Sequence, residues 1–267
     1  MAVTLTASPI CPPSRALLFA EPVRAALEFA AYQVMSEQAL PRGDRHAVVI
    51  FPGLATNGVV TRPLQSFCER LGYDCYDWGM GLNVGPQGDV QQWLTALAQR
   101  ILALTEAHPE PISLVGWSLG GIYAREVAKR VPTRVRQVVT IGTPFAGTAE
   151  HTNVGALYRM LNGGVPPTDP ELCALLSSTP PVPTTSIYSR TDGVVAWQAC
   201  VDEGHDDRRR VENVEVEGSH CGMPWNPSVL RVLADRLAQR PGNWRGYAGQ
   251  VSKAAARHSK PRSWAMA

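Results

Sequence analysis

Between residues 46 and 239, short runs of aliphatic and β-branched residues alternate with stretches whose apolar residues recur at helical spacing. A helix that crosses from one strand to the next makes the two strands parallel, so this alternation predicts a parallel sheet with helices on both faces. In chain order, the runs expected to form strands are 46–51, 73–78, 112–116, 137–142, 184–189 and 213–216. We therefore expect an α/β fold built on a mostly parallel sheet of about six strands.

The stretches between these runs predict the helices that cover the sheet. In chain order they are 62–71, 90–104, a helix from 119 that ends before Pro132, and a final helix that begins at Asn226 and Pro227. Leu94, Leu97 and Ile101 recur every three or four residues, which indicates a helix with one buried face. Asn is a favoured N-cap and Pro fits the first helical position, which supports the start of the final helix.

The pentapeptide Gly-Trp-Ser-Leu-Gly at 116–120 joins a predicted strand to a predicted helix. A tight turn at this place exposes the hydroxyl of its central serine, and it needs small flanking residues because strand and helix pack closely. Gly116 and Gly120 are the small residues here. We interpret Ser118 as a nucleophile, and a glycine-rich turn with an exposed serine is the alternative.

Where a serine is activated at such a turn, an acid and then a histidine follow in the chain, each after a later strand. Asp192 follows the run 184–189, and His220 follows the run 213–216. His220 is expected to take the proton of Ser118, and Asp192 to orient the imidazole. Two other acids, Asp202 and Asp206, stay open as alternatives to Asp192. The other histidines do not come directly after the last predicted strand: His46, His108, His151 and His205 precede it, and His258 lies in the expected tail.

Acyl transfer to a serine also needs two backbone N–H groups that stabilise the oxyanion. Leu119, directly after the serine, is expected to supply the first. Leu54, in the loop after the first predicted strand, is expected to supply the second, because Pro52 has no N–H and Gly53 allows a close backbone approach. Gly53 and Trp117 are the predicted substrate contacts. A plain Pro-Gly turn is the alternative for this loop.

The segment before the first strand predicts a helix. Apolar residues at three-to-five-residue intervals between 18 and 34 indicate an amphipathic helix, which Pro22 is expected to break. We expect it to pack on the core. Docking on lipid is the alternative, although Glu21, Glu28 and Glu37 interrupt any basic face.

The remaining segments complete the expected domain organisation. Residues 146–183 are rich in Gly and Pro and are expected to form a small cap or lid insertion. Residues 241–267 have little apolar pattern and are expected to form a flexible tail. The expected division is an N-terminal helical segment 1–45, a catalytic domain 46–240 that contains the cap, and the tail 241–267.

Composition and charge indicate which partners, cofactors and cellular location to expect. A formal net charge of +2 with interspersed signs gives no reason to expect a nucleic-acid partner. No run is apolar enough for stable membrane insertion, and no secretory signal is recognised, so we expect a cytoplasmic protein. The six cysteines lack metal-site spacing, and we expect no metal and no cofactor. Cys200 and Cys221 face one another only if the protein is exported.

With these residues in place, the chain resembles the bacterial lipase and esterase branch of the α/β-hydrolase superfamily. The stretches that carry the resemblance are 50–54, 115–121, 138–148, 188–195 and 218–220. Gly-Thr-Pro-Phe-Ala-Gly-Thr at 142–148 is similar to a segment of triacylglycerol-lipase relatives. Two positions depart from the pattern: Pro52 stands where His is usual before the glycine, and Trp117 stands where His is usual before Ser118.

The resemblance implies an α/β-hydrolase fold and hydrolysis of a carboxylic ester through an acyl-serine intermediate. It also implies a lid over an apolar acyl pocket, which the segment 146–183 fits, and no organic cofactor. The expected partner is a small-molecule or lipid ester substrate. Acyl transfer or thioester cleavage by the same three residues is the alternative activity, and a non-catalytic binding module that kept the fold is the other alternative.

Overall fold

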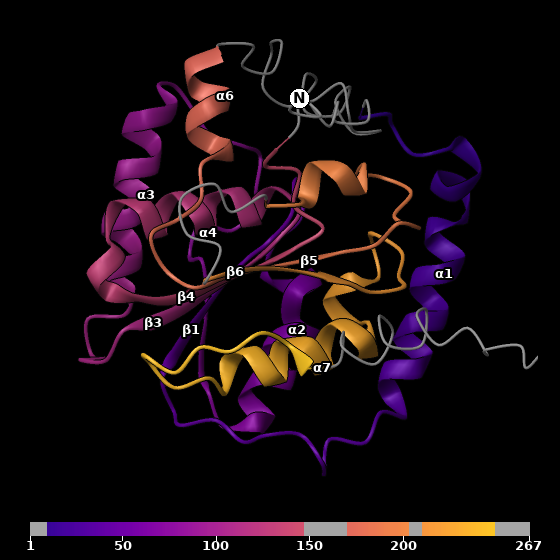
Figure 1. Ribbon diagram of the computed structural model, residues 1–267, viewed down its shortest axis with the longest axis horizontal. Helices are drawn as coiled ribbons and strands as arrows, with labels where there is room; N and C mark the ends of the chain where they lie inside the picture. Colours follow the sequence, from indigo (N-terminus) through magenta and orange to yellow (C-terminus); the bar gives the residue numbers. More distant parts are fainter. Residues whose placement is uncertain (1–9, 147–169, 203–209, 249–267) are drawn as a thin grey trace, which may run out of the picture.

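The computed structural model describes residues 10–146, 170–202 and 210–248, which fold around one six-stranded sheet (Figure 1). The strands are β1 (Ala47–Phe51), β2 (Asp74–Asp77), β3 (Ile112–Trp117), β4 (Val135–Ile141), β5 (Thr184–Tyr188) and β6 (Val211–Glu215). Their order is β2-β1-β3-β4-β5-β6, and every neighbouring pair is parallel. The predicted α/β fold with a parallel sheet is confirmed.

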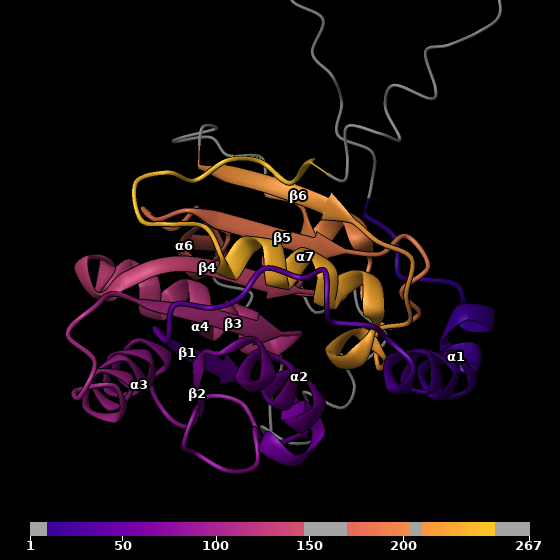
Figure 2. The same ribbon diagram turned by 90° about the horizontal axis from the view of Figure 1, so that it is seen from below.

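Helices cover both faces of the sheet, as the sequence predicted. The helices α3 (Val90–Leu104) and α4 (Leu119–Arg130) lie on one face, and α2 (Gly58–Leu71) and α7 (Pro227–Leu237) lie on the other (Figure 2). The central strands are buried from both sides, whereas the edge strands β2 and β6 are mostly half-buried. In β1, Val48 and Ile50 pack toward α2 and α7, while Val49 and Phe51 pack toward α3 and α4. Burial on both faces explains why β1 is a continuous apolar run.

The helix predicted for 62–71 begins earlier than expected. The side chain of Asn57 accepts a hydrogen bond from the amide of Val59 at 3.0 Å, and this cap starts α2 at Gly58. Gly72 ends the helix in the left-handed conformation, with φ of 99°. The strand before α2 and the cap together place the loop 52–57 at the carboxyl end of β1.

The N-terminal helix α1 (Arg15–Gln33) is continuous through Pro22, so the prediction that Pro22 breaks it is wrong. Proline removes one helical hydrogen bond, but tertiary contacts around it offset that loss. Arg24 donates to the carbonyl and the hydroxyl of Thr191, and Glu21 and Ala25 are buried. In Figure 1, α1 runs along one side of the molecule, where it contacts α7 and the short 3-10 helix η4 (Met223–Trp225).

Most of the predicted cap, 147–169, lies outside the described residues. Its described part contains α6 (Pro170–Ser177) and the connection to β5. Of the predicted tail, residues 241–248 are described and bond to the domain: the amide of Tyr247 donates to Glu212 at 2.7 Å, and Arg236 donates to the carbonyl of Arg245 at 2.6 Å. Residues 249–267 lie outside the described part of the chain.

A buried ion pair ties α4 to the segment around α6. The guanidinium of Arg125 donates to Asp202 at 2.7 Å and to the carbonyls of Ser177 and Ser178 at 3.2 and 3.0 Å. Thr179 donates to the second oxygen of Asp202 at 2.7 Å. Because both charged groups are almost fully excluded from solvent, each depends on its partner for compensation.

Arg125→Met is therefore expected to lower the free energy of unfolding by about 3–5 kcal/mol, because it leaves the carboxylate of Asp202 buried without its cation. Urea denaturation followed by circular dichroism measures this loss. Arg62→Met is the matched control, since Arg62 pairs with Glu69 at 3.6 Å on an exposed surface of α2. The control is expected to cost about 1 kcal/mol or less. Equal losses of unfolding free energy in the two variants would contradict the conclusion that the buried carboxylate of Asp202 depends on Arg125.

Candidate active site

The turn between β3 and α4 places Ser118 in a strained backbone conformation. Ser118 has φ of 54° and ψ of −127°, and only three non-glycine residues in the described part of the chain have positive φ. Its glycine neighbours have no room for a side chain, since a Cβ on Gly116 would overlap Gly121 and a Cβ on Gly120 would overlap the carbonyl of Phe51. The small residues that the sequence singled out are therefore required by packing.

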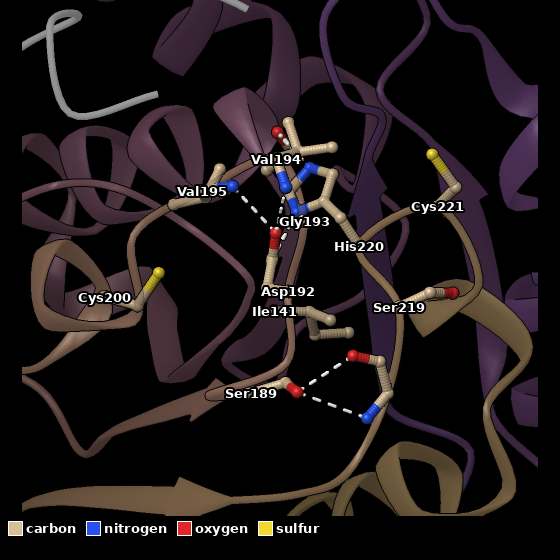
Figure 3. A network of polar contacts seen from close by, with 12 residues as sticks. Ile141, Ser189, Asp192, Gly193, Val194, Val195, Cys200, Ser219, His220 and Cys221 are labelled. Atoms are coloured by element: carbon tan, nitrogen blue, oxygen red, sulfur yellow. Dashed lines mark hydrogen bonds and ion pairs between the residues drawn. The ribbon is translucent and has the colours of Figure 1, made fainter. Parts of the chain in front are cut away.

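Ser118, His220 and Asp192 form one hydrogen-bonded chain across the carboxyl ends of the strands. The imidazole Nε2 of His220 lies 3.0 Å from the hydroxyl of Ser118, and its Nδ1 lies 2.7 Å from one oxygen of Asp192. The other oxygen of Asp192 accepts from the amides of Val194 and Val195 at 2.8 and 2.7 Å (Figure 3). With Nδ1 donating to the carboxylate, Nε2 is free to accept the serine proton.

The surroundings of His220 change its basicity. Burial lowers the pKa of His220, whereas the charge and hydrogen bond of Asp192, and to a smaller extent the charge of Glu21, raise it. The balance raises the pKa of His220 above its ordinary value. Below that pKa the imidazole is protonated and unable to accept the proton of Ser118, so the raised pKa moves the active form toward higher pH.

The alternative aspartate and histidines that the structure describes do not contact Ser118. Asp202 is paired with Arg125, as above. His46 contacts Ser113 at 2.7 Å near the amino end of the sheet, and His108 contacts the hydroxyl of Tyr76. The remaining rivals lie outside the described residues: Asp206, His151, His205 and His258.

The loop that carries Gly53 and Leu54 lies against the serine turn. A Cβ on Gly53 would lie 3.2 Å from the Cβ of Ser118 and 3.1 Å from the ring of Trp117, so glycine permits the close approach. Within the described part of the chain, the amides of Leu54 and Leu119 donate no hydrogen bond. These two N–H groups flank a serine at the point where the strand order reverses between β1 and β3, which is where ligands bind in open α/β sheets.

Asn83, which sequence reasoning missed, holds this loop. Its side chain is fully buried and donates to the carbonyl of Pro52 at 2.8 Å. Its backbone accepts from the amide of Ala55 at 2.7 Å and donates to the carbonyl of Thr56 at 2.8 Å. These bonds stabilise the positive φ of 57° at Ala55. The sequence around Asn83 has glycines at 79, 81 and 85, and this is a local signal that indicates a turn in this region.

Trp117, predicted to contact substrate, has a contact that the sequence did not suggest. Its indole N–H donates to the carbonyl of His220 at 3.1 Å, and its ring centre lies 5.8 Å from that of the imidazole. Only 5% of Trp117 is exposed. The residue before the serine thus fixes the backbone of the histidine.

Two glutamates of α1 also reach this region, and sequence reasoning missed both. Glu21 accepts from the amides of Gly193, His220 and Cys221 at 2.8, 3.0 and 2.8 Å. Glu28 accepts from the amide and hydroxyl of Ser219 at 2.7 and 2.9 Å. In the sequence they stood out only as charges on an amphipathic helix, because nothing local links them to loops more than 170 residues away.

The other sequence expectations for this region concern cysteines, metals and membranes. Cys200 and Cys221 are free thiols, the first buried and the second exposed, and Figure 3 shows their sulfurs on opposite sides of Asp192. Among the described residues, no cluster of His, Cys, Asp and Glu is arranged to hold a metal ion. None of the described helices combines the length and the apolar character needed to cross a membrane.

Comparison with known proteins identifies the family of this chain. The model of the alpha/beta hydrolase family matches residues 13–261, and the chain belongs to that family. Over 102 residues it is 30% identical to the pimeloyl-(acyl-carrier protein) methyl ester esterase of Shewanella woodyi. That match spans 38% of this chain and 37% of the relative.

The solved structures that are similar to this chain include lipases and esterases, as the sequence resemblance predicted. Aspergillus fumigatus lipase B is 20% identical with a TM-score of 0.54, over 77% of this chain and 55% of that one. Naproxen esterase from Bacillus subtilis is 10% identical with a TM-score of 0.51, over 80% of this chain and 96% of that one. At these identities the likeness shows the shared fold.

The strain at Ser118 is measurable. Ser118→Gly is expected to be about 1 kcal/mol more stable than Ser118→Ala, because glycine adopts the positive φ without strain while alanine retains it. Both variants lack the hydroxyl, so alanine is the matched control. Urea denaturation of the two proteins compares their free energies of unfolding. A glycine variant less stable than the alanine variant would show that the turn stores no strain.

Proposed function

We propose that this member of the alpha/beta hydrolase family is a serine hydrolase that cleaves carboxylic esters through an acyl-serine intermediate. The observation that carries the proposal is the continuous chain from Ser118 through His220 to Asp192, with contacts of 3.0 and 2.7 Å. Ser118 is the nucleophile, His220 the general base and then acid, and Asp192 the residue that orients the imidazole.

The first half-reaction transfers the acyl group to the enzyme. The Oγ of Ser118 attacks the carbonyl carbon of the ester while its proton passes to Nε2 of His220. The carbonyl oxygen becomes an oxyanion that accepts from the backbone N–H groups of Leu54 and Leu119. As this intermediate collapses, the bond from the acyl carbon to the alcohol oxygen breaks, and that oxygen takes the proton from His220.

The second half-reaction releases the acid. Water attacks the acyl carbon and gives a proton to Nε2 of His220, and the bond from the acyl carbon to the Oγ of Ser118 then breaks. Ser118 takes the proton back, and the carboxylic acid leaves. In both halves the carboxylate of Asp192 stabilises the imidazolium.

The proposed substrate is a small-molecule or lipid ester with an uncharged acyl chain. The half-buried side chains of Leu54 and Leu119 flank the serine turn and favour an apolar group there. The Shewanella relative is named for a methyl ester of an acyl group on a carrier protein. Because the acyl group in that name is carried by an acyl-carrier protein, the second candidate is cleavage or transfer of a carrier-bound acyl group through the same acyl-Ser118 intermediate.

Ser118→Ala is expected to lower the hydrolysis of p-nitrophenyl esters by roughly 10⁶-fold, the scale on which removal of a catalytic serine acts. The assay uses esters of graded acyl length together with an acyl-pantetheine thioester, and adds an alcohol as a competing acceptor. Undiminished hydrolysis in the variant would overturn the proposal. Faster turnover of the thioester, or transfer to the alcohol that outpaces hydrolysis, would favour the second candidate.

A fluorophosphonate tests the same serine without a carboxylic ester. Its phosphorus bonds to the Oγ of Ser118, fluoride leaves, and His220 takes the proton. Mass spectrometry is expected to find the label on Ser118 in the wild-type protein. A protein that stays unlabelled is a binding module rather than a serine hydrolase.

The identity of the acid is tested by a pair of substitutions. Asp192→Asn is expected to lower kcat by about 10⁴-fold, because the amide no longer holds the imidazole in the reactive tautomer. Asp202→Asn is the matched control and is expected to lower stability while leaving kcat within about threefold of wild type, since Asp202 pairs with Arg125. Initial rates and thermal melts of both variants show which of the two aspartates acts as the acid. The reverse pattern would make Asp202 the acid.

A further inference from the structure

We infer that Glu21, on the N-terminal helix, is a positioning residue that joins the loop of Asp192 to the loop of His220 and thereby sets the alignment of the reacting groups. The inference rests on the proposed function, because it concerns how the base and the acid of that site are held. In the described part of the chain, Glu21 hydrogen-bonds to backbone amides and to neither Ser118 nor the imidazole, so it acts through the backbone of its neighbours.

Both carboxylate oxygens of Glu21 are engaged by the two loops. One oxygen accepts from the amide of Gly193, next to the acid, at 2.8 Å and from the amide of His220 itself at 3.0 Å. The other oxygen accepts from the amide of Cys221 at 2.8 Å. The side chain is only 3% exposed, so these bonds compensate a carboxylate that has little contact with water. One side chain thus fixes the separation of two loops that follow different strands.

The loops are shaped to receive α1. A Cβ on Gly193 would lie 2.5 Å from the backbone of Leu17, and a Cβ on Gly222 would overlap the carboxylate of Glu28. Glu28 in turn accepts from the amide of Ser219, one residue before the base. Glycine at both points of closest approach shows that this contact is built into the site rather than a chance surface contact.

The negative charge of Glu21 also affects the protonation of His220. The charged groups that face the buried imidazole of His220 are Asp192, from the loop after β5, and Glu21, from α1. Arg24 lies 3.9 Å from Glu21 and opposes its charge, but 25% of the Arg24 side chain is exposed. Two uncharged groups lie beside them, the indole of Trp117 and the thiol of Cys221. Partial desolvation, together with the negative charges of Glu21 and Asp192, raises the pKa of this thiol to about 12, so it stays neutral. A negative Glu21 therefore favours the imidazolium that forms during the reaction.

The test is Glu21→Gln in the full chain, with ester hydrolysis measured across pH. The amide cannot accept from all three N–H groups and carries no charge. We expect kcat to fall by about 10- to 100-fold with little change in KM, the scale of a small misplacement of reacting groups. We also expect the acidic limb of kcat/KM to move to lower pH, because losing the negative charge lowers the pKa of His220.

Glu37→Gln is the matched control. Glu37 belongs to the same N-terminal segment but pairs with Arg70 of α2 at 2.6 Å. Its kcat and pH profile are expected to match the wild type. A Glu21→Gln protein that is less stable but keeps the wild-type kcat and acidic limb would overturn the inference, since Glu21 would then only hold the fold together.

Glu21→Asp covers the case in which Glu21→Gln does not fold. The shorter side chain keeps the charge but does not reach both loops, so kcat is expected to fall while the acidic limb stays near that of wild type. Wild-type kcat in Glu21→Asp overturns the inference. The rate of fluorophosphonate labelling at Ser118 serves as the readout that separates the two proposals. Absence of labelling in the wild type defeats the proposed function, whereas equal labelling of wild type and Glu21→Gln at every pH defeats only the inference.

Discussion

The close contact between β3 and α4 is the constraint on which the rest of the structure depends. The backbone of Gly116 touches Gly121, and Gly120 touches the carbonyl of Phe51, so three segments meet with no side chain between them. This contact forces the serine between them into a positive φ and turns its hydroxyl toward the carboxyl end of the sheet. Because the strands are parallel, the loops that carry Asp192 and His220 lie at the same edge of the sheet, which a sheet of mixed direction would not achieve.

Backbone amides are the main partners of the buried carboxylates around this edge. Asp192 is bound by two amides and the imidazole, and Glu21 is bound by three amides. An amide offers a fixed direction and no rotamer freedom, so such bonds define geometry more sharply than a pair of long side chains. Trp117 adds a further bond to the histidine backbone, at its carbonyl, whereas Glu21 binds its amide. The histidine is therefore held at its main chain as well as at its ring.

The sheet and the three aligned residues were predictable because their signals are local. A few residues suffice to recognise an aliphatic run, glycines near a serine, or a histidine after the last strand. The order of these features along the chain then indicated that Asp192 and His220 belong with Ser118. Glu21 and Asn83 were not predictable in this way, because their roles come from contacts with distant segments, from 27 residues away (Asn83 with Thr56) to 200 residues away (Glu21 with Cys221). The prediction that Pro22 breaks the helix was wrong because it used a local rule. Tertiary contacts of Glu21 and Arg24 outweigh the local effect of the proline. The segment 147–169, where the cap was predicted, lies outside the described residues.

The contacts of α1 also fix when the site can be completed as the chain is made. A ribosome releases the N-terminus first, so α1 exists for most of synthesis without the amides that its glutamates bind. The amide of Gly193 comes after five of the six strands, and those of Ser219, His220 and Cys221 come after all six. Contact between α1 and these amides closes a loop of roughly 200 residues. The entropy cost of this closure is high until the sheet has formed and brings the two segments together. The alignment of Ser118 with His220 and Asp192 is thus tied to a late stage of folding, and a chain that is still being made carries Ser118 without its two hydrogen-bonded partners.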